Sequence, residues 1–414
     1  MRPLFWLFLP LICLLVVPGR GRADQPVAAM KAEATSPTSR ALTAQEISDG
    51  WIRLFDGETT FGWKSNQTDI NWKVADGVVS ADKGSIGLLV TTTEFADYEL
   101  SCDYRLEKGG NSGIFLRTLF DPKDPVTDCY ELNTCDSHPK FPTGSLVGIV
   151  KPDQPVLGEG IWKTFQVKAL GDQIDVKLDG KLILSYTDKR PVARRRGFIG
   201  LQKNAGRAEF RNVFLRPLGT QPLFNARDLN GWKVVPGSKS TFTVEGGAIH
   251  VRNGPGFLES NGTWGDFVLQ SEVRTNGAGL NSGIFFRAMA GTEKNPSNGY
   301  ELQINNVWQD NNRYKPVDWG TGAIYRRAMA RKVISNDFEW FTITLVANGP
   351  HLSTWVNGEP VADSTDIRKP HENPRKGLRV QPGHFILQGH DQKTDVLFRN
   401  LRAVEVPVAA GKVP

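Results

Sequence analysis

Residues 281–287 read Asn-Ser-Gly-Ile-Phe-Phe-Arg, and residues 111–117 read Asn-Ser-Gly-Ile-Phe-Leu-Arg. Each motif is followed at the same distance by Tyr-Glu-Leu, at residues 130–132 and 300–302. The offset is 170 residues for both motifs, since 281 − 111 equals 300 − 130. Self-similarity over such a long period indicates that the chain contains one domain twice.

The repeat extends in both directions from these motifs. Upstream, Gly-Trp at residues 62–63 matches residues 231–232, with an offset of 169 (232 − 63). Downstream, Phe-Arg-Asn at residues 210–212 matches residues 398–400, with an offset of 188 (398 − 210). The growing offset shows that the second copy carries insertions.

The insertions fall between Tyr300 and Trp340 and again before Phe385, where we expect loops, because loops vary most between copies of a domain. A Pro-, Gly- and Thr-containing stretch near residues 217–222 suits a short linker between the two copies. We therefore expect one domain over residues 47–218 and a second over residues 219–407.

The N-terminus has the pattern of a secretory signal. Arg2 precedes an apolar run over residues 4–17, and small residues follow at the position that a signal peptidase reads. The run is interrupted by Pro10 and is shorter than the roughly 20 residues of a spanning helix. We predict a signal peptide over residues 1–23, a disordered spacer over residues 24–46, and a secreted or periplasmic protein without a membrane anchor after cleavage.

Net charge and cysteine content narrow the function classes. The formal net charge of +6 is mild for 414 residues, and the basic residues are scattered, so we do not expect nucleic-acid binding. Cys102, Cys129 and Cys135 have no counterparts in the second copy, so the fold does not require them. On one straight strand Cys129 and Cys135 would lie about 20 Å apart, too far for a disulfide, whereas Cys102 could pair with either.

The local pattern is that of β-strands. Residues 98–104, 174–178 and 341–346 alternate polar and apolar side chains, which is typical of antiparallel sheets with one face packed on a core. Turn pairs such as Asp179-Gly180 and Asn357-Gly358 separate the strands. Many short strands with little helical periodicity predict an all-β sandwich or jelly roll in each copy.

The ordered motifs, together with Thr-Gly, Leu-Gln and Phe-Arg-Asn, resemble the 3-keto-disaccharide hydrolase family in both copies. The resemblance implies two tandem concanavalin A-like jelly-roll β-sandwiches. It also implies activity on sugars whose C3 hydroxyl has been oxidised to a ketone, with a separate sugar 3-dehydrogenase supplying that oxidation. An oligosaccharide or glycoside is the implied substrate.

Strand periodicity places polar side chains on common faces, because residues i, i+2 and i+4 point the same way. In the second copy Glu301, Gln303 and Asn305 share one face, and Asn281, Gly283, Phe285 and Arg287 share another row. A guanidinium, an aromatic ring and amides side by side are typical of a sugar site. Alternatively, Arg287 and Glu301 form only a salt bridge across adjacent strands.

A ketone at C3 acidifies the proton at C2, so a general base can remove it, after which the C1 substituent is eliminated and water adds. This route needs one base, an acid for the leaving group and a donor to the enolate oxygen. Direct glycoside hydrolysis needs two carboxylates at defined separation. Each copy offers one well-placed glutamate on this strand, Glu131 or Glu301, which favours the keto-sugar route.

The two copies differ around these strands. The second has Tyr325 and His390, as the family pattern does, where the first has Val147 and Asn204. We therefore predict catalysis in the second copy, with Glu301 and His390 as acid and base and Arg287 as the donor. The predicted substrate ligands in the two copies are Asn281, Gln303, Tyr325, Phe285, Arg117, Glu131, Asp136 and His138.

A non-catalytic, lectin-like protein that binds carbohydrate through both copies is the main alternative. The first copy is then a binding module, or a variant site that uses Glu131, Asp136 and His138. No His-x-x-x-His, Cys-x-x-Cys or Gly-rich phosphate loop occurs, so we predict no cofactor and no transition metal. Calcium held by loop oxygens is compatible with concanavalin-like domains, but no motif here supports it.

Overall fold

The computed structural model of the chain describes residues 39–191 and 193–407. The predicted signal peptide and residues 24–38 of the predicted spacer lie outside the described residues. The last residues of the predicted spacer, 39–46, are described, and part of this segment belongs to helix α1 (Ala44–Ser48). Thr43 and Glu46 cap its first turn reciprocally, which satisfies backbone donors that a short helix would otherwise leave unpaired. The expected spacer is therefore too long at its C-terminal end.

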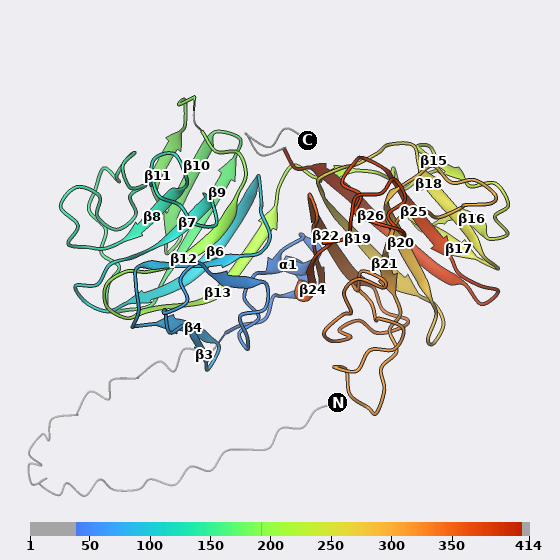
Figure 1. Ribbon diagram of the computed structural model, residues 1–414, viewed down its shortest axis with the longest axis horizontal. Coiled ribbons are helices and arrows are strands. Elements are labelled where there is room, and N and C mark those ends of the chain that lie inside the picture. The colour runs from blue at the N-terminus through green and yellow to red at the C-terminus, as the bar shows by residue number, and fades with distance from the viewer. Residues whose placement is uncertain (1–38, 192, 408–414) are drawn as a thin grey trace, which may run out of the picture. The chain divides into compact units, whose positions relative to one another are not determined.

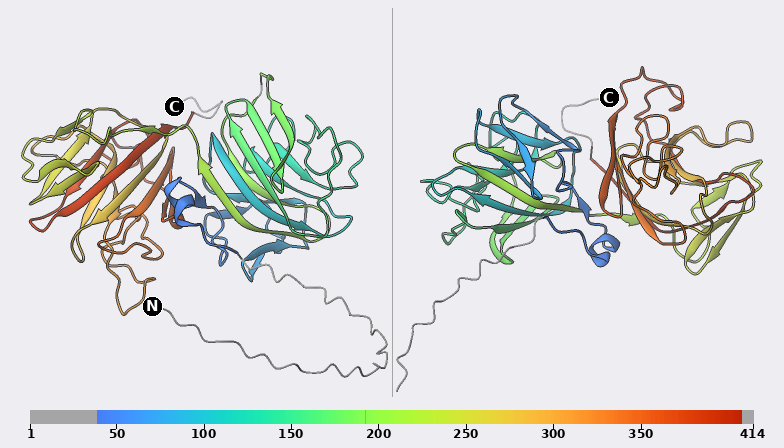
Figure 2. Two further views of the ribbon diagram at one scale, coloured as in Figure 1. Left: turned by 180° about the vertical axis from the view of Figure 1, so that it is seen from behind. Right: turned by 90° about the horizontal axis from the view of Figure 1, so that it is seen from below.

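The described chain folds into two β-sandwiches, one after the other in sequence (Figures 1 and 2). Each sandwich contains an eight-stranded and a five-stranded sheet, and the strand pairings inside them are antiparallel. The expectation of an all-β chain with two tandem concanavalin A-like sandwiches is confirmed.

The first sandwich contains the strands up to the linker. Its eight-stranded sheet comprises β1 (Ile52–Arg53), β3 (Lys73–Ala75), β4 (Val78–Ala81), β6 (Tyr98–Leu106), β9 (Lys163–Leu170), β10 (Gln173–Leu178), β11 (Lys181–Thr187) and β13 (Ala208–Pro217). Its five-stranded sheet has the order β2 (Trp63–Ser65), β5 (Gly87–Thr91), β12 (Phe198–Lys203), β7 (Ser112–Thr118) and β8 (Tyr130–Thr134).

The second sandwich repeats this arrangement. Its eight-stranded sheet comprises β14 (Gln221–Pro222), β16 (Thr241–Glu245), β17 (Ala248–Arg252), β19 (Phe267–Thr275), β22 (Phe341–Asn348), β23 (His351–Val356), β24 (Glu359–Thr365) and β26 (Asp395–Glu405). Its five-stranded sheet has the order β15 (Trp232–Val234), β18 (Gly256–Ser260), β25 (His384–Gly389), β20 (Ser282–Ala288) and β21 (Tyr300–Ile304).

Alternation and turn chemistry explain the strands. Along β6, every second residue from Tyr98 to Leu106 is buried and the intervening residues are half-buried, so one face packs on the core. The hairpin between β10 and β11 turns at Asp179 and Gly180, whose φ angles are +49° and +83°. Both central residues of such a tight hairpin need positive φ, and an Asp-Gly pair tolerates it.

Each sandwich has its own core between its two sheets. In the first, Tyr98, Ile114, Leu132, Phe165 and Phe210 belong to one buried cluster. In the second, the buried cluster contains Phe267, Phe286, Leu302, Phe341 and Leu387. In both, the Ile and Leu of the repeated motifs point into the core, so alternate residues of the same strands point outward.

The three cysteines in the described residues are buried free thiols, so the disulfide considered for Cys102 does not form. Within the described ranges, no helix is long and apolar enough to cross a membrane.

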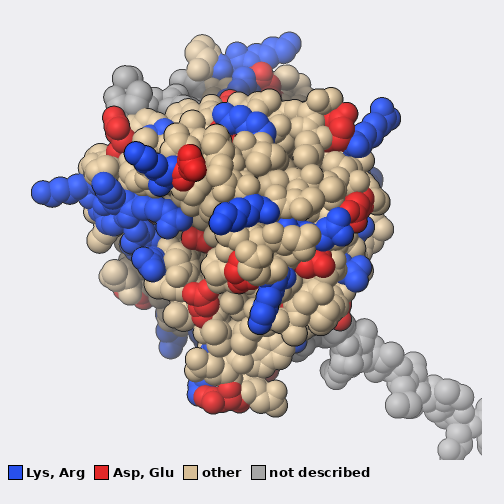
Figure 3. Space-filling view, turned by 90° about the vertical axis from the view of Figure 1, so that its right-hand side faces the viewer, with Lys and Arg blue, Asp and Glu red and all other residues tan. Residues whose placement is uncertain are grey.

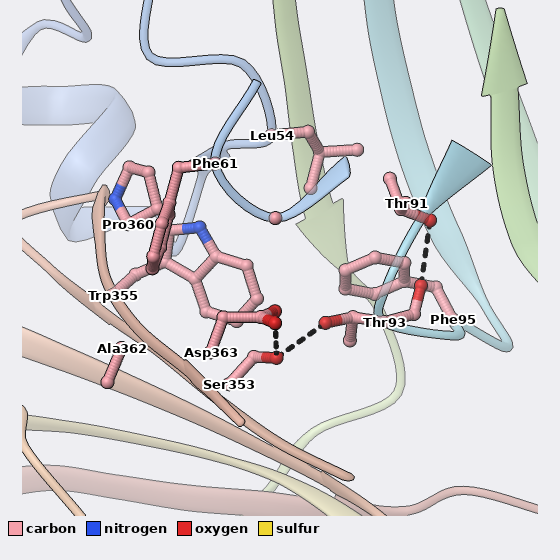
Figure 4. Close-up of a pocket in the computed structure, with 11 residues that line it drawn as sticks. Leu54, Phe61, Thr91, Thr93, Phe95, Ser353, Trp355, Pro360, Ala362 and Asp363 are labelled. Atoms are coloured by element: carbon pink, nitrogen blue, oxygen red, sulfur yellow. Dashed lines mark hydrogen bonds between the residues drawn. The ribbon is translucent and has the colours of Figure 1, made fainter. Parts of the chain in front are cut away.

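Hydrogen bonds also link residues of the two sandwiches. The amide of Arg53 donates to the carbonyl of Gly358 (2.7 Å), and the indole of Trp355 donates to the carbonyl of Arg53 (2.9 Å). Figure 4 shows a small pocket in this region, where the hydroxyls of Thr93 and Ser353 lie 2.6 Å apart and Ser353 donates to Asp363 (3.0 Å). The pocket has a volume of about 10 Å³, which suits one water molecule rather than a sugar.

Candidate functional site

The outward face of the five-stranded sheet in the second sandwich carries the repeated polar motifs. Its core-facing residues are Leu258, Ile284, Leu302 and Leu387. The residues next to these along each strand therefore point outward. Across the sheet the outward residues pair in rows, and one row consists of Glu259, Ile386, Phe285 and Glu301. The adjacent row pairs Phe257 with Gln388 and Gly283 with Gln303. Glu301 and Gln303 thus share a face, as their spacing predicted.

Glu301 is the principal titratable group on this face. Glu301 is only 8 % exposed to solvent. Burial raises the pKa of the Glu301 carboxyl to about 7, although the positive charges of Arg375 and His390 act in the opposite direction. The nearest cation is Arg375, whose Nη2 lies 3.8 Å from Glu301 Oε2. A carboxyl that titrates near neutral pH is suited to accept and return a proton.

Amide side chains also lie on this face. Asp318 Oδ2 accepts hydrogen bonds from Asn281 Nδ2 (2.6 Å) and Gln303 Nε2 (2.9 Å), which orients both amide groups. The carbonyl oxygens of Asn281, Gln303 and Gln388 are buried and have no hydrogen-bond partner among the described residues. A buried acceptor without a protein partner is unfavourable, so these oxygens can accept hydrogen bonds from water or from a ligand that supplies donors.

Two aromatic rings pack on the face that carries Glu301, and the ring of Phe285, an expected substrate ligand, is fully buried. The rings of Phe257 and Phe285 meet edge to face, with centroids 6.0 Å apart. The guanidinium of Arg375 lies 5.2 Å above the centre of the Phe285 ring, and its Nε donates to the carbonyl of Ser297 (3.0 Å). Beside Glu301 the surface is hollowed into a cleft of about 150 Å³.

Tyr325 and His390 lie at the margins of the face. Tyr325 lines the cleft, and its ring meets that of Trp319 edge to face at 5.9 Å. His390 follows β25, and its Nδ1 lies 3.0 Å from Asp391 Oδ2. When Nδ1 donates to that carboxylate, Nε2 is left to exchange a proton with a ligand. His390 is near enough to Glu301 for its charge to act on the Glu301 pKa.

Arg287 does not belong to this face, contrary to our expectation. Its side chain is fully buried. Its Nε donates to the carbonyl of Gly265 (2.8 Å), Nη1 to those of Gly349 (2.6 Å) and Arg379 (3.1 Å), and Nη2 to Asp266 (3.1 Å). The alternative pairing with Glu301 does not form either. Burial lowers the Arg287 pKa to about 10, so the guanidinium remains charged at neutral pH.

The reason is a break in strand geometry. The register between β20 and β25 shifts between Phe285 and Ala288, and Arg287 has a φ of +47°. A β-bulge inserts an extra residue and re-aims the side chains that follow it, so strict alternation stops before Arg287. Arg117 of the first sandwich has the same φ and is likewise fully buried. It is therefore a structural residue too, rather than the substrate ligand that we expected.

The corresponding face of the first sandwich has Glu131 in the position of Glu301, but the side chains around this carboxyl differ. Burial raises the pKa of Glu131 to about 7, and Gln202 donates to its Oε1 (3.2 Å). Leu88, Val90 and Phe115 form a buried apolar cluster on this sheet. Among the described residues, no basic side chain pairs with Glu131, in contrast to Arg375 beside Glu301.

Asp136 and His138 hold a loop of the first sandwich rather than facing Glu131. The Asp136 carboxylate accepts from the hydroxyl of Thr143 (2.6 Å) and the amide of Gly158 (3.0 Å). His138 Nδ1 accepts from the amide of Phe141 (2.9 Å). Both side chains are therefore occupied by local structure, and their expected role in a variant site lacks support.

Asp318, Arg375 and Gln388 are site residues that the sequence did not single out. Asp318 and Arg375 lie in the two insertions of the second copy, after Tyr300 and before Phe385. The growing repeat offset could have pointed to these residues. An insertion next to a face that both copies share can contribute side chains to a site on that face. Gln388 has a counterpart, Gln202, at the same place in the first copy, and its side chain points to the face through strand alternation.

The tyrosine of each Tyr-Glu-Leu motif has a structural role that can be tested. The Tyr300 hydroxyl donates to Asp366 Oδ2 (2.7 Å) and accepts from the amide of Arg379 (3.0 Å). We expect Tyr300→Phe to lower the free energy of unfolding by about 1.5–3 kcal/mol, the usual contribution of a hydrogen bond to a charged group. Urea unfolding measures this change. Tyr130→Phe is the matched variant, since Tyr130 donates to Asp188 (2.6 Å). Unchanged midpoints in both variants would contradict the role.

Clusters of metal-ligating side chains are absent from the described residues. Across residues 39–191 and 193–407, no three His, Cys, Asp or Glu side chains are grouped to hold a metal ion. The expectation that the protein needs no cofactor stays a prediction.

Comparisons with known proteins identify a family that matches both sandwiches. A family model described as a 3-keto-alpha-glucoside-1,2-lyase-like domain matches residues 50–216 and 219–403. A 3-keto-disaccharide hydrolase of Bacteroides thetaiotaomicron is 30 % identical over 249 residues, covering 44 % of this chain and 85 % of that protein.

Two solved structures are among those similar to this chain. A candidate glycosyl hydrolase of Parabacteroides distasonis has a TM-score of 0.39 at 21 % identity, covering 44 % of this chain and all of the other. The carbohydrate-binding module CBM66 of Bacillus subtilis has a TM-score of 0.30 at 19 % identity, covering 37 % and 95 % of the two chains.

Proposed function

Because this chain belongs to the 3-keto-alpha-glucoside-1,2-lyase-like family in both of its sandwiches, we propose that it is a secreted or periplasmic enzyme that cleaves 3-keto-glycosides. Catalysis takes place on the second sandwich. The observation that carries the proposal is the buried Glu301 carboxyl, whose pKa is raised to about 7 amid amide oxygens without protein partners.

The reaction begins with proton abstraction. Glu301 takes the proton from C2 of the keto-sugar, and the electrons of that C–H bond form an enolate with the C3 carbonyl. Arg375 replaces Arg287 as the donor to the enolate oxygen, since Arg287 is buried and fully engaged.

Elimination and hydration complete the cycle. The enolate collapses, the bond from C1 to its substituent breaks, and His390 protonates the departing oxygen. Water then adds at C1 of the enone and gives up a proton to His390, which restores the acid, while Glu301 returns its proton to C2. Asn281, Gln303 and Tyr325 position the sugar through its hydroxyls and ring face.

Direct hydrolysis by a carboxylate pair fits this face less well. Glu259 is the other carboxylate in the row of Glu301, and two strands lie between their strands. Three strand spacings amount to roughly 14 Å. Retaining and inverting glycosidases place their two carboxylates about 5–9.5 Å apart. Glu259 is also fully buried and bound to Lys233 (2.8 Å).

The first sandwich contributes a carbohydrate-binding face rather than a second catalytic centre. It keeps Glu131 and Gln202 but lacks counterparts of His390 and Tyr325. The oxidised substrate comes from a separate sugar 3-dehydrogenase, because the proposed reaction begins from a ketone and does not create it.

A pair of chromogenic glycosides tests the function. We expect the wild-type protein to release the chromophore from a 3-keto-glucoside and not from the ordinary glucoside, because only the ketone acidifies C2. His390→Ala should lower kcat/KM by about 10² or more through loss of the acid. His138→Ala, in the first sandwich, is the matched control and should retain activity.

Two results would contradict the proposal. Release from the ordinary glucoside alone would replace the elimination mechanism with direct hydrolysis. Release from neither glycoside, together with measurable glycan binding, would establish a tandem carbohydrate-binding protein instead.

A further inference from the structure

The cleft beside Glu301 is rich in arginine. Arg326, Arg327 and Arg375 line it, and Glu301 is the only acidic residue among the residues that line it. The surroundings of these arginines decide whether their charge is already neutralised or is available to a ligand.

The protein does not neutralise Arg326 and Arg327. Within the described residues, neither guanidinium has a carboxylate oxygen within 4.0 Å. Arg327 donates only to the backbone carbonyls of Arg326 (3.0 Å) and Arg375 (3.1 Å). Burial, followed by the nearby charge of Arg368, lowers the Arg327 pKa, although the charge of Asp366 acts in the opposite direction. Positive charge is therefore held at this cleft against mutual repulsion.

The backbone at Arg326 supplies an independent observation. Arg326 has a φ of +58°, in the left-handed region that disfavours residues with a side chain. The same turn of the first sandwich, marked by the bridge Leu146↔Val150 against Ile324↔Ala328, has Gly148 at this position with a φ of +76°. The second copy thus carries arginine where the fold suits glycine. Strained residues of this kind cluster at ligand-binding sites.

The charge on the face of the molecule in Figure 3 is unevenly distributed. Lys and Arg side chains gather at the left of this view, and over the rest of the face they are interspersed with Asp and Glu. The first sandwich has Gly148 and Ile149 where the second has Arg326 and Arg327, so the fold does not need these charges. Arg375 is accounted for by its position next to Glu301, which leaves Arg326 and Arg327 without a role in the reaction.

We infer that Arg326 and Arg327 bind an anionic group of the substrate, a carboxylate or a sulfate, so that the preferred substrate is an acidic 3-keto-glycoside. The inference rests on the proposed function for the reaction itself. Guanidinium groups suit both anions because they donate two parallel hydrogen bonds to a pair of oxygens.

Three chromogenic 3-keto-glycosides test this substrate class: the neutral glucoside, its C6 carboxylate and its C6 sulfate ester. We expect kcat/KM of the wild-type protein to be about 10- to 100-fold higher for at least one acidic compound, the range of a charge-assisted hydrogen bond. The carboxylate and sulfate arms distinguish the two sources of charge. Arg326→Gly should lower kcat/KM for the acidic glycoside at least about tenfold more than for the neutral one.

Arg326→Gly is expected to fold, because glycine occupies this turn in the first sandwich. Arg227→Gly removes one positive charge from an exposed loop of the same sandwich and is the control for net charge. Equal kcat/KM for neutral and acidic glycosides in both wild type and Arg326→Gly would overturn the inference and leave the proposed function standing.

Binding of unoxidised sugars distinguishes failure of the proposed function from failure of the inferred anion preference. If no keto-glycoside is cleaved, calorimetry with glucuronide, glucose 6-sulfate and glucose still measures the anion preference. Preferential binding of an acidic sugar that Arg326→Gly abolishes would support the inference while the proposed function fails. Equal binding of all three sugars would overturn the inference.

Discussion

Glu301→Gln is expected to abolish cleavage of 3-keto-glycosides, with a loss of about 10²–10⁴ in kcat. Glutamine keeps the size of the side chain and cannot accept the C2 proton. In the wild-type protein, kcat/KM should rise with pH and level off above the pKa of about 7, because only the carboxylate acts as a base. Steady-state rates between pH 5 and pH 9 measure this profile.

Glu301→Gln is expected to abolish cleavage but to stabilise the folded protein above neutral pH. The folded-state pKa of Glu301 is raised from 4.5 to about 7, so the folded protein binds more protons than the unfolded chain between these pH values. The free energy of unfolding therefore falls as pH rises through this window, by about 3 kcal/mol for the whole shift. Glu301→Gln should remove most of this loss and stabilise the protein at pH 8 but not at pH 4.

Glu131→Gln is the matched variant. Its pKa is raised to about the same value, so its stability should change with pH in the same way, whereas its effect on cleavage should be far smaller. Loss of activity with a gain of stability is what a catalytic group in an unfavourable environment produces. Cleavage that survives in Glu301→Gln, or an equal loss in Glu131→Gln, would remove Glu301 from the mechanism.

Arg287→Met is expected to destabilise the second sandwich by about 3–5 kcal/mol, because it breaks a buried ion pair and leaves Asp266 with less compensation. Methionine retains the aliphatic volume but none of the donors. The carbonyls of Gly265, Gly349 and Arg379 lose their hydrogen bonds. Urea unfolding followed by fluorescence measures the change.

Arg117→Met should be about as destabilising for the first sandwich. Its guanidinium donates to the carbonyls of Ala96, Gly171 and Arg194 and pairs with Asp97 at 2.8 Å. Two similar losses in different sandwiches would establish a structural device of the fold. An Arg287→Met protein with an unchanged unfolding midpoint and no activity would instead restore its role as the enolate donor.

The fate of Arg287 shows where a strand pattern ends. Alternation correctly placed Phe285 and Glu301 on one face, because their strands are regular and register follows side-chain period. It failed two residues later, since a β-bulge depends on how β20 pairs with β25. The pairing is a long-range property, and no local signal at Arg287 revealed it. The identical φ of Arg117 came from the same pairing in the first copy.

The sequence predicted where the loops beside the site are inserted, but not which of their side chains reach it. The growing repeat offset located insertions after Tyr300 and before Phe385, and these now contain Asp318 and Arg375. Which residues of an insertion reach the sheet depends on loop conformation, which contacts far along the chain determine. The sequence therefore indicated that the second copy differs, without showing that it gathers arginine.

By itself, the sequence determined that this protein is two copies of one β-domain, that Glu131 and Glu301 occupy equivalent outward positions, and that only the second copy keeps Tyr325 and His390. Repeats and side-chain alternation are local properties, so they can be read along the chain. Only the tertiary structure decided that Glu301 is buried enough to titrate near neutral pH, that Arg287 is structural, and that Arg375 takes the place beside the carboxyl. Burial, charge and hydrogen bonding depend on residues brought together across strands and loops, and that proximity exists only in the folded chain.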